Sequence, residues 1–228
     1  MQIFTDILNI FYPNTCLSCD NILTTNEKTV CTDCIYNLPL TDYTKNNDIS
    51  VEKIFYGRVK IEQATALLYY TKKGIVQQLI HNLKYRGYEE VGVFIGDWLG
   101  KEIVKHSYFK DIDYIIPVPL HKNRLKQRGY NQVTKFGEKL SHYLEKPLIK
   151  DVLIKKSASS TQTKKSRFER AKNVKELFFL TDLLKFENKH ILLIDDIITT
   201  GATLEACANE LLKTKNIKIS IAVMAVTE

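Results

Sequence analysis

Apolar residues recur in two alternating patterns from about residue 60 onward. Short continuous apolar runs predict buried strands, and apolar residues spaced three and four apart predict one-sided helices. The predicted strands span residues 63–70, 113–120, 189–195 and 218–226. The predicted helices span residues 74–85, 89–106, 131–144 and 201–213. Such alternation is typical of an α/β fold, so we expect a mainly parallel sheet with helices on both faces.

The first residues, MQIFTDILNIFYP, are mainly apolar. They lack a basic start and carry Asp6 inside the apolar stretch, which argues against a secretory signal peptide and favours a short amphipathic helix. No apolar run approaches the roughly 18 residues that a membrane-spanning helix needs. We therefore expect a cytoplasmic protein without membrane insertion.

Four of the five cysteines form two pairs, Cys16 with Cys19 and Cys31 with Cys34, and two residues separate the cysteines of each pair. Two such pairs supply the four thiolates of a tetrahedral Zn²⁺ site; a disulfide or redox role is the alternative. Four protein ligands leave no position for water, so the predicted zinc is structural. Cys207 shares an apolar helix face and is interpreted as a core residue.

The cysteine pairs and the charge distribution both distinguish the first 50 residues from the rest of the chain. We predict an N-terminal helix and a four-cysteine zinc-finger module over residues 1–50, followed by an α/β domain over residues 51–228. The chain has a net charge of +7, but residues 121–175 hold 16 basic and 4 acidic residues, whereas residues 1–50 have a net charge of −4. Such a basic block is typical of contact with phosphate or nucleic acid, with a solvated Lys-rich surface as the alternative.

The predicted strand 189–195 runs into two adjacent acids, Asp195 and Asp196, in the stretch ILLIDDIITTGATL. Hydroxyl residues and Gly201 then open a helix. Backbone N–H groups at a helix N-terminus bind phosphate, and glycine lets the backbone approach closely. The carboxylates can accept hydrogen bonds from sugar hydroxyls or bind a hydrated Mg²⁺. The stretch therefore predicts a sugar-phosphate site, with a pair of acids that only caps the helix as the alternative.

This stretch resembles the PRPP-binding motif of type I phosphoribosyltransferases. The resemblance implies a phosphoribosyltransferase-like fold that binds PRPP with Mg²⁺. It implies that Asp195 and Asp196 are the catalytic acids and hold the ribose hydroxyls. The phosphate-binding loop that it implies consists of Thr199, Thr200, Gly201, Ala202 and Thr203.

Several motifs in a fixed order also resemble the ComF family of competence-associated proteins. They are the cysteine pairs, LKYRG at 83–87, PVPLHKNRLKQRGYNQ at 117–132, QTKKSRFERAKNV at 162–174 and the PRPP motif. This resemblance implies a role in natural transformation, with single-stranded DNA and other DNA-uptake proteins as partners.

The phosphoribosyltransferase resemblance also implies a pyrophosphate-binding loop after the strand 113–120. Cations suit such an anion, and the same side chains could contact DNA. The candidate residues are His121, Lys122, Arg124 and Arg128, with Arg167 and Arg170 in a second basic stretch interpreted as a flap over the ligand. No acceptor-binding element can be recognised. Two functions therefore stay open: a PRPP-binding, DNA-binding protein of DNA uptake, and an active phosphoribosyltransferase of nucleotide salvage or metabolism.

Overall fold

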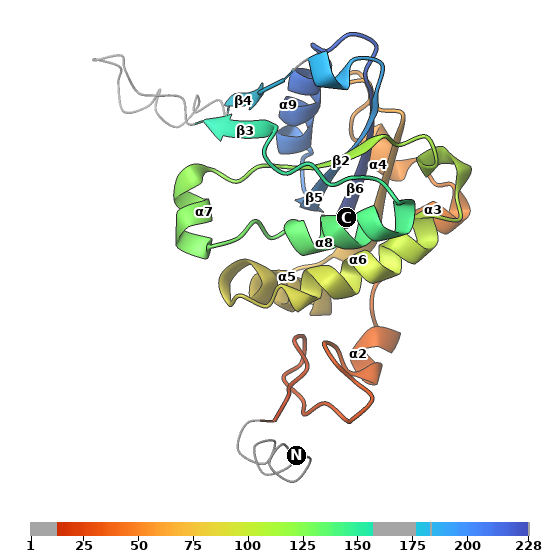
Figure 1. The fold of residues 1–228 in the computed structure, drawn as a ribbon. Helices are drawn as coiled ribbons and strands as arrows, with labels where there is room; N and C mark the ends of the chain where they lie inside the picture. Colours follow the sequence, from red (N-terminus) through yellow and green to blue (C-terminus); the bar gives the residue numbers. More distant parts are fainter. Residues whose placement is uncertain (1–12, 157–176, 183, 228) are drawn as a thin grey trace, which may run out of the picture.

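The computed structural model describes residues 13–156, 177–182 and 184–227, and a parallel sheet forms the centre of the molecule (Figure 1). Within these residues the sheet has four strands in the order β1-β6-β5-β2. The strands are β1 (Gln63–Tyr70), β2 (Tyr114–Pro117), β5 (His190–Ile198) and β6 (Lys218–Thr227). A separate antiparallel ribbon pairs β3 (Leu153–Lys156) with β4 (Leu177–Leu180).

Helices cover both faces of this sheet. The short helices before the sheet are α2 (Thr32–Tyr36), α3 (Tyr43–Asn46) and α4 (Ser50–Lys53). The helices of the body are α5 (Ile75–Tyr85), α6 (Glu90–Ile103), α7 (Lys122–Arg128), α8 (Thr134–Leu144) and α9 (Ala202–Leu211), with 3₁₀ turns η1 (Ser107–Phe109) and η2 (Leu184–Phe186).

Two apolar cores lie on opposite sides of the sheet. In the first core, α5, α6 and α8 pack on side chains such as Leu192 and Ile194 of β5. In the second, α9 and the β3–β4 ribbon pack on Leu193 of β5 and Ile221 of β6. Neighbouring strand residues alternate between the faces, which explains why these strands are apolar almost throughout. This arrangement confirms the predicted α/β fold with helices on both faces.

Glycines in the middle of α6 let it touch α8. A Cβ atom at Gly96 would lie 2.9 Å from the carbonyl oxygen of Phe136, and one at Gly100 would overlap the ring of Tyr143. Glycine normally weakens a helix. Here its small size permits close packing of two helices, which accounts for three glycines inside the predicted helix 89–106.

Two elements near the predicted site differ from the sequence prediction. Strand β5 continues past residue 195 because Ile197 and Ile198 pair with β6, so the two acids lie within the strand. The basic segment that we predicted as a loop forms helix α7, which starts after His121 and ends at Gly129 with a φ of 83°. Helix α7 buries none of its residues, so apolar periodicity could not reveal it.

The N-terminal segment packs against the body through the first core. Cys16, Leu17 and Val30 are buried in the core that also contains α5 and α6. The buried Asn82 of α5 donates its amide N–H to the carbonyl oxygen of Leu17 at 2.8 Å, and the Ser18 hydroxyl donates to the carbonyl oxygen of Ile75 at 3.4 Å. Helix α5 therefore holds the cysteine-bearing segment at several points.

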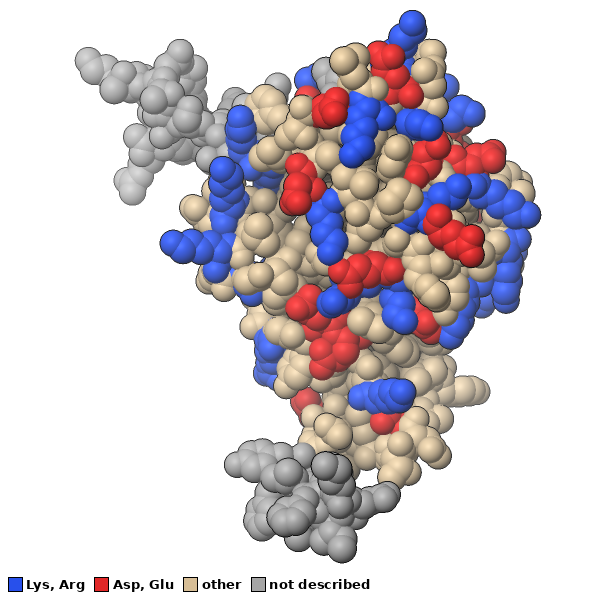
Figure 2. Space-filling model, in the orientation of Figure 1, with Lys and Arg blue, Asp and Glu red and all other residues tan. Residues whose placement is uncertain are grey.

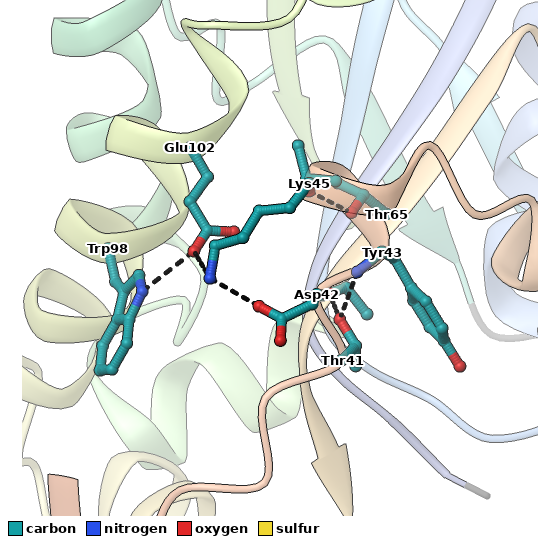
Figure 3. A network of polar contacts seen from close by, with 9 residues as sticks. Thr41, Asp42, Tyr43, Lys45, Thr65, Trp98 and Glu102 are labelled. Carbon is teal, nitrogen blue, oxygen red and sulfur yellow. Dashed lines mark hydrogen bonds and ion pairs between the residues drawn. The ribbon is translucent and has the colours of Figure 1, made fainter. Parts of the chain in front are cut away.

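The chain that follows this segment is fixed to the body by a polar network (Figure 3). The Lys45 ammonium lies 2.5 Å from an Asp42 carboxylate oxygen and 3.3 Å from Glu102 of α6. Trp98 donates its indole N–H to the same Glu102 oxygen at 3.1 Å. Because α3 also packs against β1, residues on both sides of position 50 contact the sheet. The division into domains at residue 50 stays a prediction.

Candidate functional site

The predicted phosphate loop joins β5 to α9. Thr199, Thr200 and Ala202 are exposed, and Gly201 is buried with a φ of 73°. Residues with a side chain rarely adopt the positive φ of Gly201, and a Cβ atom added there would lie 3.0 Å from an Ile54 methyl group. The loop therefore requires glycine at this position. It presents the N-terminus of a ten-residue helix to solvent, where backbone N–H groups and the helix dipole favour an anion.

Arg58 holds this loop from the segment before β1. Its guanidinium donates to the carbonyl oxygen of Thr200 at 2.8 Å and to that of Ile54 at 3.1 Å. It also pairs with the carboxylate of Glu205, in the first turn of α9, through Nε at 2.9 Å and through Nη2. Arg58 thus orients the loop backbone and compensates a negative charge beside the expected phosphate position. Nothing in the sequence pattern indicated Arg58.

The two acids of β5 have different surroundings. Adjacent strand residues point to opposite faces, and Asp195 lines a small hollow together with residues 197–204, which comprise the end of β5, the loop and the start of α9. One Asp195 oxygen accepts the backbone N–H of Asp196 at 2.8 Å. Burial raises the pKa of Asp195 to about 8, and the nearby charge of Asp196 adds to this effect. Burial therefore favours the neutral form of Asp195 in the free protein.

We expect this raised pKa to appear in the pH dependence of stability. In the unfolded chain the Asp195 carboxyl has the ordinary pKa of 3.8, whereas in the folded chain its pKa is about 8. The folded state therefore has its full stability from this group below about pH 4 and loses that contribution as the pH rises through about 8. Asp195→Asn cannot titrate. Its melting temperature relative to the unsubstituted chain should therefore increase from about pH 5 to about pH 8 and then level off. Thermal unfolding of both chains across this pH range tests the prediction. A difference in melting temperature that does not change with pH would contradict it.

Asp196 is held by a chain of polar contacts on the other face. The Lys84 ammonium of α5 lies 2.8 Å from one Asp196 oxygen, and the Gln132 amide donates to the other at 2.7 Å. Arg128 of α7 in turn donates to the Gln132 side-chain oxygen. Lys84 and Gln132 lie inside the motifs at 83–87 and 117–132, but the motifs alone indicated no role for either side chain. The structure brings both to the predicted ribose acid.

The predicted pyrophosphate residues lie on or beside α7. His121 accepts the backbone N–H of Asn123 at 3.2 Å and caps the helix, while Lys122 and Arg124 are exposed. A cavity of about 360 Å³ separates α7 from the end of α5. Its lining residues are Lys84, Tyr85, Gly87, Arg124, Gln127, Arg128 and Tyr130. Figure 2 shows Lys and Arg side chains along the edge of the molecule where α7 and β3 lie. Arg167 and Arg170, with the predicted flap 162–174, lie outside the described residues.

The predicted zinc ligands converge in space. The Sγ atoms of Cys16, Cys19, Cys31 and Cys34 all lie within 4.8 Å of one another. Burial raises the pKa of Cys16, but hydrogen bonds from backbone N–H groups, chiefly that of Cys31, outweigh it and lower the pKa to about 7. A tetrahedral Zn²⁺ with thiolate ligands fits this donor set, because four sulfurs surround one point and three of the four side chains are buried.

Comparison with known proteins agrees with this geometry. Residues 134–227 match the family model of the phosphoribosyl transferase domain. Competence protein F of Haemophilus influenzae is 36% identical over 100 residues, which are 43% of this chain and 44% of that protein. Competence protein ComFC of Bacillus subtilis is 31% identical over 147 residues, 63% of this chain and 56% of that protein. The DNA utilization protein YhgH of Salmonella typhimurium is 29% identical over 138 residues, 59% of this chain and 60% of that protein.

These matches confirm the resemblance that the sequence motifs indicated, both to phosphoribosyltransferases and to the competence-associated relatives. The chain spans about half the length of the curated relatives it matches. Among the described helices, none combines the length and the apolar character that a bilayer crossing requires.

Proposed function

We propose that this chain, which is similar to competence proteins of the ComF type and matches a phosphoribosyl transferase domain over residues 134–227, binds PRPP and acts in DNA uptake. One observation carries the ligand assignment. Asp195 and Asp196 lie near the end of β5, and the exposed loop that follows the strand leads through the buried Gly201 into α9, so carboxylates and an anion site are a few residues apart. PRPP carries both groups that such a site would bind, ribose hydroxyls and a 5′-phosphate. Arg58 supports the assignment because it holds the loop backbone and does not line the hollow formed by Asp195 and residues 197–204.

The site has donors that suit Mg²⁺ as well as PRPP. Carboxylate oxygens are the protein ligands that Mg²⁺ takes, and it typically binds through one or two of them together with substrate phosphates. Because the two side chains leave β5 toward opposite faces, one of them, Asp195 or Asp196, would hold such an ion together with the ligand. The bound ion would supply positive charge that offsets the diphosphate.

Calorimetric titration of the full chain with PRPP in the presence of Mg²⁺ tests this proposal. We expect saturable binding, with ribose 5-phosphate binding more weakly because it lacks the diphosphate. Absence of PRPP binding by the folded, metal-loaded chain would overturn the ligand assignment.

We further propose that single-stranded DNA binds along the basic segment 121–175. Its net charge of +12 contrasts with −4 over residues 1–50, to which a zinc ion with four thiolates would add a formal −2. The exposed helix α7 belongs to this segment and carries four of its cations. Lys and Arg that neutralise phosphates release counterions, so such binding depends steeply on salt.

Arg124→Ala with Arg128→Ala is expected to weaken binding of a labelled oligonucleotide about tenfold and to reduce the salt dependence. Fluorescence anisotropy across a salt series measures both, and Arg167→Ala with Arg170→Ala examines the second basic stretch. Lys60→Ala with Lys101→Ala removes the same charge outside the segment and serves as the control. Full binding by both arginine variants, or binding insensitive to salt, would place the DNA site elsewhere. PRPP should compete with DNA if both use α7.

The alternative is an active phosphoribosyltransferase, and the α5–α7 cavity, whose wall residue Lys84 contacts Asp196, favours it. At about 360 Å³ it is comparable to small-molecule sites. The reaction would displace pyrophosphate at the ribose C1, with Arg124, Arg128 and Lys84 offsetting the charge of the leaving group. Pyrophosphate release from PRPP, measured with a panel of nucleobases, tests turnover. Release above the level without a base supports the alternative, and PRPP binding without release supports a ligand-binding role.

A further inference from the structure

Lys84 belongs to two neighbouring sites. It lies in the last turn of α5, and its ammonium contacts Asp196 at 2.8 Å while its side chain keeps 23% of its surface exposed. The same side chain lines the cavity between α5 and α7. Lys84 therefore contacts both the predicted ribose-binding Asp196 and a cavity to which the sequence motifs gave no function.

This cavity has the chemistry of an anion site. Lys84 enters from α5, and Arg124 and Arg128 enter from α7, so cations face it from two sides. None of its lining residues is acidic. The Arg128 guanidinium lies over the ring of Tyr85, with its carbon 5.8 Å from the ring centroid, which restrains the guanidinium at the cavity wall. A compact polyanion would meet several cations here without a repelling carboxylate on the wall.

In the free protein Lys84 compensates Asp196, which has only 7% of its side-chain surface exposed. A buried carboxylate without such a partner is costly. A ligand that brings ribose hydroxyls to Asp196, with a divalent cation, would replace this compensation. The lysine side chain is long and flexible and acts as a point charge, so its ammonium can exchange Asp196 for an anion in the cavity that Lys84 lines.

We propose that Lys84 is a binding residue for the diphosphate of the ligand, which it contacts in the α5–α7 cavity after exchanging Asp196 for phosphate oxygens. The proposal rests on the PRPP-binding function proposed above. It extends the diphosphate site from α7 to α5 and gives the LKYRG motif at 83–87 a chemical role.

Calorimetry with inorganic pyrophosphate and with ribose 5-phosphate, each with Mg²⁺, separates the two ends of the ligand. Lys84→Met should weaken pyrophosphate binding about tenfold or more, because it removes a charge-assisted contact. Binding of ribose 5-phosphate should change less than about twofold. Lys84→Arg should retain most of the pyrophosphate affinity. Lys101→Met, which removes an exposed lysine paired with Asp97, is the control and should bind both probes normally.

A second pair of variants avoids an uncompensated Asp196. Asp196→Asn releases Lys84 from its ion pair and serves as the reference background, in which any loss of metal binding at Asp196 is already included. Asp196→Asn with Lys84→Met should then lose about tenfold or more relative to Asp196→Asn alone. This comparison isolates the lysine charge from its contact with the carboxylate.

Pyrophosphate binding that is unaffected by loss of Lys84 would overturn the proposal. Equal weakening of pyrophosphate and ribose 5-phosphate would also overturn it, because Lys84 would then act only by orienting Asp196. A chain that binds pyrophosphate through Lys84 but binds neither PRPP nor ribose 5-phosphate would support the diphosphate site and refute the proposed PRPP function.

Discussion

Asp195→Asn combined with Asp196→Asn is expected to weaken PRPP binding by about 100-fold or more, since two charge-assisted contacts are lost together. The substitutions preserve the shape of both side chains and the acceptor for the Asp196 backbone N–H. They remove the charge of Asp196 and the charge that Asp195 would gain when a bound cation favours its ionised form, which together would hold the ribose hydroxyls and the metal-bound ligand. Titration calorimetry with PRPP and Mg²⁺ measures the loss.

Two other carboxylates provide the control for net charge. Asp151 and Asp182 are exposed residues near the β3–β4 ribbon, and Asp151→Asn with Asp182→Asn should bind PRPP like the unsubstituted chain. Unchanged affinity in a folded Asp195/Asp196 double variant would mean that these acids do not contact the ligand. Circular dichroism establishes that both double variants are folded.

Loss of the predicted zinc should have the largest effect on stability. Binding free energies of structural zinc are on the order of 10 kcal/mol and are coupled to folding. Cys31→Ser removes one ligand of the sulfur cluster and should expose the segment 14–38 to limited proteolysis and rapid hydrogen exchange. Metal analysis of the purified chain should give about one zinc per molecule, and the variant should have far less.

Cys207→Ala is the matched control, because it removes a buried cysteine of α9 that lies outside the sulfur cluster. It should lower stability by about 1 to 2 kcal/mol at most, as expected for a small truncation in the core, and leave the zinc content unchanged. A native, protease-resistant chain that contains no metal would refute the zinc assignment.

The sequence was sufficient for features that depend on local periodicity or on close spacing. The apolar runs of β5 and β6 and the one-sided patterns of α5 and α8 each led to the correct element. The cysteine spacing predicted a cluster that the fold assembles. In these cases the pattern itself reflects burial or geometry.

Features that depend on long-range contacts were not predictable. Arg58 reaches Thr200 and Glu205 across more than 140 positions, and Lys84 reaches Asp196 across 112. No periodicity connects such residues before the sheet forms. Helix α7 was not predicted for a different reason: an exposed helix has no apolar face, so its sequence shows no helical periodicity of apolar residues.

Helix α5 touches both the cysteine cluster and the ligand site. Asn82 holds the backbone of Leu17 beside the cluster, and Lys84, two positions later, holds Asp196. If metal binding orders this end of α5, zinc occupancy and ligand affinity become thermodynamically linked through one rigid element. Such linkage is reciprocal, so a ligand that binds more tightly to the zinc-loaded chain must oppose the release of zinc to the same extent in free energy. The small N-terminal module would then control the sensitivity of the site to metal supply.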